Sequence, residues 1–211
     1  MNLDIRLEDP KDHRAVEELT REAFWNVHVP GCCEHYILHQ LRKSADFIPG
    51  LDFVAVSDGH LVGNVVHTTS HIIDQSGEKH QVITFGPLSV LPSMQKQGVG
   101  SALVRHSIGA ATRKGCTAIC IYGNPRYYSR FGFQAAEKYH FKTSAGKYAA
   151  ALLALELTDG ALQGIGGRFI ESAVFEADPE AVEAFDKSFP AKEKLVTPSQ
   201  ERFKLLSNLV H

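Results

Sequence analysis

The chain has little cysteine, little excess charge and no long apolar segment. Its 4 cysteines in 211 residues are too few for a disulfide framework, and no Cys-x-x-Cys pair is present for a zinc ribbon or a redox dithiol. The 22 Lys and Arg nearly balance 24 Asp and Glu, whereas a nucleic-acid-binding protein needs clustered basic residues. The longest apolar run, residues 148–155, is far short of the roughly 20 residues that span a membrane. We therefore expect a protein that binds neither nucleic acid nor membrane.

Targeting and metal signals are also missing. The first residues carry acids where a signal peptide has a positive start and an apolar run, so we expect a cytoplasmic protein. The 11 histidines show neither HExxH nor His/Cys ligand spacing, so we expect no metal. The 44% of apolar and 22% of charged residues are typical of a globular protein. The length predicts one domain, residues 1–157, with residues 158–211 as a C-terminal extension that packs on it.

Hydrophobic periodicity predicts an α/β fold with a mixed sheet. Asp58-Gly59 between two apolar runs indicates a hairpin. A strand, an 18-residue helix (residues 97–114) and another strand indicate a right-handed crossover, so those two strands should be parallel. The extension contains two helices that each begin with Asp or Thr followed by Pro. The other elements expected are helices at 11–24 and 33–43, strands within 3–7, 53–56, 61–73, 80–92 and 117–123, a short helix or turn at 125–131, a last strand at 150–157, and the extension's helices at 178–189 and 197–210.

A glycine-rich loop, residues 87–103 (PLSVLPSMQKQGVGSAL), joins a strand to a helix that begins near Gly98 and Gly100. Unpaired N–H groups and the positive end of the helix dipole make such a start an anion site suited to a pyrophosphate. A plain helix start with a glycine-rich turn is the alternative. The Walker A pattern is absent, because no Gly-Lys-Ser/Thr closes the loop. The dinucleotide fingerprint also fails, because Leu103 stands at its third small position and no ribose-binding acid lies about 20 residues on.

Two ordered motifs resemble those of the GNAT superfamily of N-acyltransferases. Val90-x-Pro92-x-x-Gln95-x-x-Gly98-x-Gly100-x-x-Leu103 resembles its acyl-CoA signature, and Tyr128-Ser-Arg-Phe-Gly-Phe133 is similar to its second motif. The longer GNPRYYSRFGF is similar to predicted acetyltransferases of the YhbS type. The resemblance covers residues 3 to about 157. It implies a GNAT-like acyl-CoA N-acyltransferase fold with a splayed central sheet, acetyl-CoA as co-substrate, and transfer of acetyl to a primary amine by direct attack.

The sequence itself indicates where the sheet splays. Gly86-Pro87 favours a bulge and removes a ladder donor, so we expect the strand to part there from its parallel neighbour. The resemblance implies that the pantetheine arm of CoA fills this gap, and that Tyr128 is the general acid for the CoA thiolate. A phenol stays protonated at neutral pH, as that role requires. The residues expected to bind the coenzyme are Leu88, Ser89, Val90, Gln95, Lys96, Gln97, Gly98, Val99, Gly100, Ser101 and Asn124, with Lys96, Arg105, Arg126 and Arg130 as candidates for its 3′-phosphate.

The acceptor side is less determined by the sequence. The resemblance points to a base at Thr84, which cannot serve, so no general base is identified. Candidates for contact with the acceptor, in the loop between the first two helices, are Trp25, Asn26, His28, Glu34 and His35. Glu34 would steer a cationic amine, and His35 would take its proton. Trp25 is also a candidate core anchor. Asn124 is equally a candidate loop cap. The acceptor expected is a small-molecule or peptide amine. The sequence leaves the oligomeric state open, and the resemblance makes a homodimer the candidate assembly. A non-catalytic acyl-CoA-binding sensor or interaction module is the alternative function.

Overall fold

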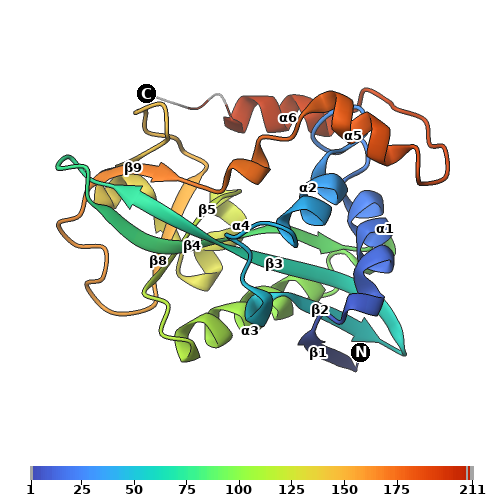
Figure 1. The fold of residues 1–211 in the computed structure, drawn as a ribbon, viewed down its shortest axis with the longest axis horizontal. Helices are drawn as coiled ribbons and strands as arrows, with labels where there is room; N and C mark the ends of the chain where they lie inside the picture. The colour runs from blue at the N-terminus through green and yellow to red at the C-terminus, as the bar shows by residue number, and fades with distance from the viewer. Residues whose placement is uncertain (1, 208, 210–211) are drawn as a thin grey trace.

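A mixed sheet runs through the centre of the molecule, with helices on both of its faces (Figure 1). A computed structural model describes residues 2–207 and 209. The strands follow the order β1-β2-β3-β4-β5-β8-β6, and β9 pairs with both β3 and β7. The strands are β1 (Leu3–Leu7), β2 (Phe53–Ser57), β3 (His60–Ile73), β4 (Lys79–Val90), β5 (Ala118–Tyr122), β6 (Gln134–Ala135), β7 (Phe141–Lys142), β8 (Leu152–Glu156) and β9 (Gly167–Ile170). The helices are α1 (His13–Phe24), α2 (Glu34–Leu41), α3 (Val99–Arg113), α4 (Pro125–Tyr128), α5 (Pro179–Asp186) and α6 (Pro198–Ser207).

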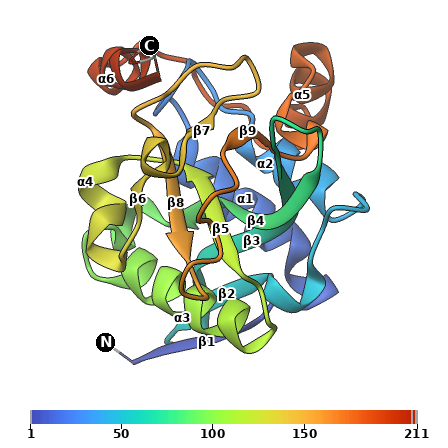
Figure 2. The same cartoon turned by 90° about the vertical axis from the view of Figure 1, so that its left-hand side faces the viewer.

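The two faces of the sheet have separate cores because side chains alternate along each strand. Val65 of β3 packs in a cluster with α3, whereas its neighbour Val66 packs in a cluster with α1 and α2. Figures 1 and 2 show α3 on the opposite side of the molecule from α5 and α6. None of the described helices combines the length and the apolarity that crossing a bilayer demands.

Local sequence signals predict the central hairpin correctly. Strands β2, β3 and β4 are antiparallel in succession, as expected. Asp58 and Gly59 join β2 to β3 with φ angles of 50° and 80°. Both angles lie in the region that a two-residue hairpin turn of type I′ requires, which explains the preference for Asp-Gly at this position.

Strands β4 and β5 part soon after they meet. They are parallel, as predicted, and pair at the single register Ile83–Ile119. On its other edge β4 remains paired with β3 up to Val90, although the register shifts: Gly86 and Pro87 together oppose Val66. The predicted bulge at Gly86-Pro87 and the splayed sheet are therefore confirmed. The last part of β4 has one unfilled edge.

The sheet continues beyond the predicted last strand. Strand β9 pairs with β3 and β7, and its Phe169 lies in a buried cluster beside β5 and β8. The expectation that residues 150–157 form the last strand is therefore wrong. A four-residue strand directly after a glycine-rich loop is too short to show a periodic pattern.

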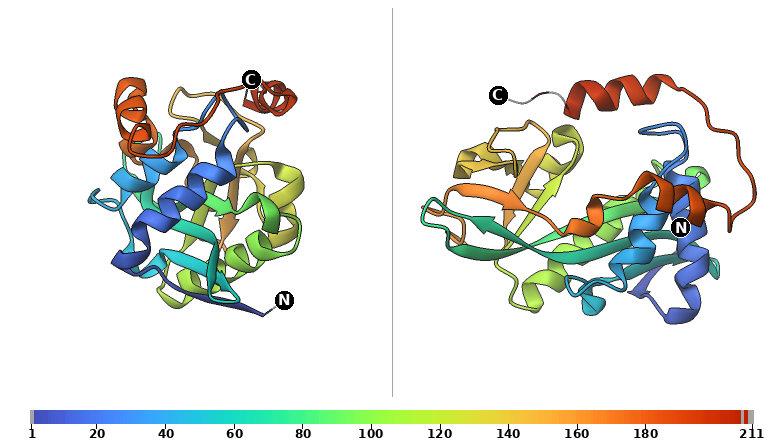
Figure 3. Two further views of the ribbon diagram at one scale, coloured as in Figure 1. Left: turned by 90° about the vertical axis from the view of Figure 1, so that its right-hand side faces the viewer. Right: turned by 45° about the horizontal axis from the view of Figure 1, so that its top comes forward.

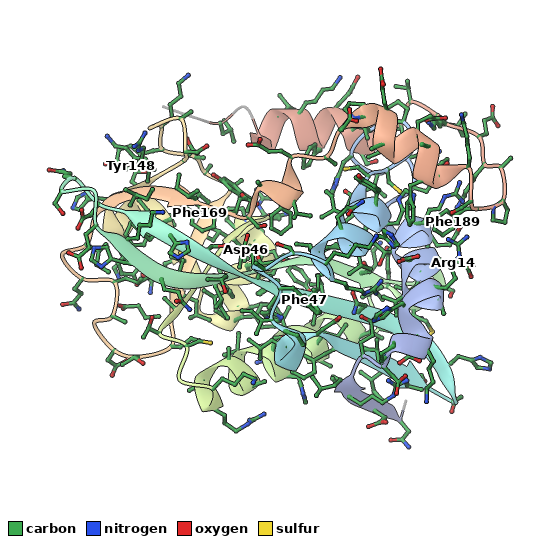
Figure 4. The ribbon with its side chains drawn as sticks, viewed as in Figure 1. Arg14, Asp46, Phe47, Tyr148, Phe169 and Phe189 are labelled. Atoms are coloured by element: carbon green, nitrogen blue, oxygen red, sulfur yellow. The ribbon has the colours of Figure 1, made fainter. Side chains whose placement is uncertain are left out.

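The remaining C-terminal residues form the two expected helices (Figure 3). Asp178 caps α5 by accepting hydrogen bonds from two backbone N–H groups, and Pro179 and Pro198 are the first helical residues. The segment after α5 packs on α1: the Arg14 guanidinium lies 3.6 Å from the ring centre of Phe189 (Figure 4).

Candidate active site

The unfilled edge of β4 exposes main-chain groups of alternate residues. Leu91 N donates to Val62 O at 3.0 Å, so these two residues form a hydrogen-bonded pair of the β3–β4 ladder. Such pairs alternate with pairs whose N–H and C=O groups point away from the partner strand. The register Gly63–Val90 and Val65–Leu88 gives Leu88 and Val90 the outward positions. Their main-chain groups therefore face the gap, whereas those of Ser89 face β3.

Helix α3 begins where this edge ends. Gly98 has a φ of 94°, and the first helical bond runs from Ala102 N to Gly98 O at 2.9 Å. The amides of residues 99–101 therefore have no helical partner, and they lie at the positive end of the helix dipole. A Cβ on Gly100 would lie 3.0 Å from the hydroxyl of Tyr127, so glycine keeps the main chain accessible here.

A pocket of about 630 Å³ lies between the edge of β4, the start of α3 and the end of α1. Such a volume is typical of sites for small molecules and cofactors. Its lining contains many of the residues expected at a coenzyme site, together with three from α1 and the following loop that carry no sequence signal. The lining residues are Ala23, Phe24, Val27, Leu88, Val90, Gln95, Lys96, Gly98, Gly100, Ser101, Tyr127 and Arg130.

Four of the residues expected to bind a coenzyme do not line this pocket. Ser89 is buried and donates to the Thr20 hydroxyl at 2.9 Å, and the Val99 side chain is in the core. Gln97 donates to Ser93 O at 2.7 Å. Asn124 accepts from the amide N of residue 126 at 3.0 Å, so its side chain is the cap of α4 that the sequence left as an alternative.

The two adjacent tyrosines have different surroundings. Tyr127 lines the pocket, whereas the ring of Tyr128 lies 5.8 Å from Phe85 and 5.7 Å from Phe133. Gly123 makes room for it, because a Cβ there would lie 2.4 Å from a ring carbon. Burial raises the pKa of Tyr128 above its ordinary value, and the hydroxyl has no hydrogen bond to any described residue. Tyr128 is therefore a protonated phenol at neutral pH.

Positive charge reaches the pocket from two sides. Lys96 stands in the loop before α3, and the Arg130 guanidinium lies 4.0 Å from the ring centre of Tyr127. Arg105 instead lies over the ring of Phe131, at 5.2 Å, and neither it nor Arg126 lines the pocket. Of the four candidate cations, two are therefore placed where an anion at the start of α3 would meet them.

The residues expected to meet an amine are engaged by other parts of the chain. Trp25 Nε1 donates to Glu193 O at 2.8 Å, which makes Trp25 an anchor for the C-terminal extension. Glu34 lies 3.0 Å from His28 Nδ1. His35 is 0% exposed, with Nε2 3.1 Å from Asp186, and burial lowers its pKa. A fully buried imidazole cannot meet an amine, so the prediction for His35 is corrected.

A second pocket, of about 780 Å³, lies beside the turn between β3 and β4. Asp74 lines it and, with Glu78 and His80, forms the one group of three or more metal-ligand side chains, among those that the structure describes, whose ligand atoms lie within 4.8 Å of one another. Asp74 already accepts hydrogen bonds from Ser76 and lies 2.8 Å from His80. No helix in the described part of the chain begins at this pocket, so the pocket lacks the anion-binding geometry found at the start of α3.

Comparison with known proteins identifies the family. A family profile described as "Acetyltransferase (GNAT) domain" matches residues 50–135. The chain is 30% identical over 164 residues to the uncharacterized N-acetyltransferase YhbS of Escherichia coli strain K12, an alignment that covers 77% of this chain and 92% of that protein. The chain belongs to the GNAT family of N-acetyltransferases.

Solved structures agree with this assignment. The crystal structure of Escherichia coli YhbS in complex with CoA superposes with a TM-score of 0.73 at 26% identity, covering 83% of this chain and 92% of that one. A GNAT acetyltransferase from Brucella melitensis in complex with acetyl-CoA gives a TM-score of 0.67 at 25% identity, covering 82% and 98%. The predicted GNAT-like fold is therefore confirmed.

Proposed function

We propose that this protein transfers the acetyl group of acetyl-CoA to a primary amine of a small molecule or peptide, by direct attack of the amine nitrogen on the thioester carbon. One observation carries the proposal: the outward-facing main chain of Leu88 and Val90 leads directly to the unpaired amides at the start of α3. Two similar proteins of known structure were crystallised with CoA and with acetyl-CoA.

The coenzyme's diphosphate binds the amides of residues 99–101, with Lys96 and Arg130 supplying positive charge. Its amide-bearing arm pairs with the edge of β4 in the manner of an added strand, because Leu88 presents a donor and an acceptor to the gap and Val90 presents a donor. Gly98 and Gly100 keep side chains out of the space that the phosphates occupy.

The same edge polarises the thioester. Val90 O accepts a hydrogen bond from Gln95 Nε2 at 3.2 Å, which leaves Val90 N–H as a donor to the acetyl carbonyl oxygen. A donor aimed at the oxygen on which charge develops stabilises the transition state. Tyr128 then protonates the departing CoA thiolate, a role that fits a phenol whose pKa is raised by burial.

Tyr128→Phe tests the acid, with Tyr148→Phe as a matched control. Tyr148 lies against Lys142, 5.1 Å from its ammonium, and does not line the pocket (Figure 4). With acetyl-CoA, a thiol reporter and a panel of primary amines, Tyr128→Phe should lower kcat by about 100-fold, the scale of general acid catalysis, with little change in the KM of acetyl-CoA. Tyr148→Phe should retain the wild-type rate.

Equal rates for Tyr128→Phe and the wild type would remove Tyr128 from the mechanism. If the wild type binds acetyl-CoA but does not release thiol with any amine of the panel, the proposal fails, and a non-catalytic acyl-CoA-binding module is favoured instead.

A further inference from the structure

The pocket assigned to acetyl-CoA lacks a group that accepts a proton from the acceptor. Among the described residues that line it there is neither a carboxylate nor a histidine. A primary amine with a pKa of about 10 is an ammonium at neutral pH and has to lose a proton before it attacks. A proton acceptor therefore has to come from outside this pocket.

The face of the sheet away from α3 is the other approach to the gap. Ile83, Phe85 and Ile121 pack in the cluster on the α3 side, whereas Val82 and Cys120 pack in the cluster on the opposite face. By alternation, Thr84 of β4 and Tyr122 of β5 belong to that opposite face. Both follow the last paired residues, so they lie where β4 and β5 part.

Strand β9 brings a carboxylate to this place. Its pairing with β3, His71–Ile170 and Ile72–Phe169, makes Ser70–Glu171 the next pair in register. Ser70 Oγ lies 2.7 Å from the hydroxyl of Thr84. The ring of Phe169, labelled in Figure 4, lies 5.8 Å from that of Tyr122. Glu171 thus belongs to the same face as Thr84 and Tyr122, and its charge acts on Tyr122 at the end of β5.

Unlike several other partly buried carboxylates, Glu171 has no cationic partner among the described side chains. Glu8 and Glu17 each contact Arg42, and Asp186 contacts Arg21. No hydrogen bond or ion pair joins Glu171 to a residue whose side chain the structure describes, that is, residues 2–201, 203–205 and 209. A partly buried carboxylate without a partner lowers stability and is typical of functional sites.

The surroundings of Glu171 suit a base at neutral pH. Burial, with a smaller contribution from the negative charge of Glu176, raises the pKa of Glu171 to about 7. No cation among the described residues opposes this effect. Glu171 in turn contributes, after burial, to raising the pKa of Tyr122 to about 12, so the Tyr122 hydroxyl stays neutral beside it.

We propose, on the basis of the proposed function, that Glu171 binds the ammonium group of the acceptor and takes its proton, which makes it a catalytic base supplied by β9. The N–H bond breaks, the proton moves to a Glu171 carboxylate oxygen, and the nitrogen lone pair forms the bond to the acetyl carbon as the C–S bond breaks. Tyr128 gives its proton to the CoA sulfur, and the second proton that nitrogen loses restores the Tyr128 hydroxyl. Glu171 and Glu176 together favour an acceptor of positive charge.

The test is the pH profile of kcat/KM for the full chain, measured with a primary amine that the wild type acetylates. The wild type should show a rise with pH through about 7, because the carboxylate form is the base. Glu171→Gln should lose this rise, raise the KM of the amine and lower kcat/KM about 100-fold at pH 7.5. The calorimetric affinity for CoA, which also verifies folding, should be unchanged.

Two further variants separate the base from a structural role. Glu171→Asp should keep the rise with pH and recover part of the rate. Glu176→Gln should keep the rise and move it to lower pH, because a neighbouring negative charge is removed.

A Glu171→Gln profile that coincides with the wild type overturns the inference and leaves the proposed function standing. Loss of CoA affinity in both Glu171→Gln and Glu171→Asp also overturns it, since the residue would then be structural. Absence of turnover in the wild type with every amine overturns the proposed function as well.

Discussion

Glu171 also makes a prediction about stability that needs no substrate. Its pKa is about 7 in the folded protein, against an ordinary value of 4.5. Between these values the folded protein binds the proton more tightly than the unfolded chain, so stability falls as pH rises. Below the lower value both states are protonated and the effect disappears. Glu171→Gln keeps the shape and removes the charge, so it should stabilise the protein at pH 8.

The size of the effect follows from the two pKa values. At about 1.4 kcal/mol for each pH unit between them, the ionised carboxylate costs about 3 kcal/mol at pH 8. The assay is urea unfolding of wild type and Glu171→Gln at pH 4.5 and pH 8, because the difference between the two proteins cancels the titration of every other group. The difference should be near zero at pH 4.5 and about 3 kcal/mol in favour of the variant at pH 8.

Exposed Glu201 provides the control. Glu201→Gln should change the free energy of unfolding by less than about 0.5 kcal/mol at either pH, as is usual for a surface substitution. A Glu171→Gln protein that is no more stable than the wild type at pH 8 would refute the reasoning, because the carboxylate would then have a stabilising partner.

Two further substitutions test the coenzyme pocket and the C-terminal extension. Gly100→Ala should weaken CoA binding about tenfold in calorimetry, because the added Cβ would lie 3.0 Å from the Tyr127 hydroxyl; this loss is close to that of one hydrogen bond to a charged group. Adding Tyr127→Phe should restore part of the CoA affinity. Wild-type affinity for Gly100→Ala alone would contradict the assigned site. Asp186→Asn should cost about 3 kcal/mol of unfolding free energy, because it leaves the buried Arg21 without its partner. Glu183→Gln, which removes an exposed contact with a lysine, should cost less than about 1 kcal/mol in the same urea titration. Equal losses for the two would contradict the difference in burial.

Features that depend on neighbouring residues were predictable from the sequence. The Asp58-Gly59 turn, the bulge at Gly86-Pro87 and the start of α3 at Gly98 each follow from the main-chain preferences of those residues themselves. The positions of Leu88 and Val90 were only partly predictable from the sequence. The gap between β4 and β5 was expected, but which residues of β4 face it depends on the β3–β4 register.

Features that depend on distant partners were not predictable. His35 is on a short helix, and its burial comes from Phe185, Asp186 and Phe189, about 150 residues away in the chain. Motif spacing singles out Tyr128, yet only packing distinguishes it from Tyr127, which lines the pocket. Glu171 has no motif at all, because its surroundings arise from the pairing of β9 with β3.

The central claim is that CoA lies along the free edge of β4 and at the start of α3, and amide hydrogen exchange followed by NMR tests it most directly. On addition of CoA, the amides of Leu88 and Val90 and of residues 99–101 should become protected, whereas that of Ser89, already paired with β3, should change little. Protection confined to residues 162–166, at the second pocket, would contradict the claim.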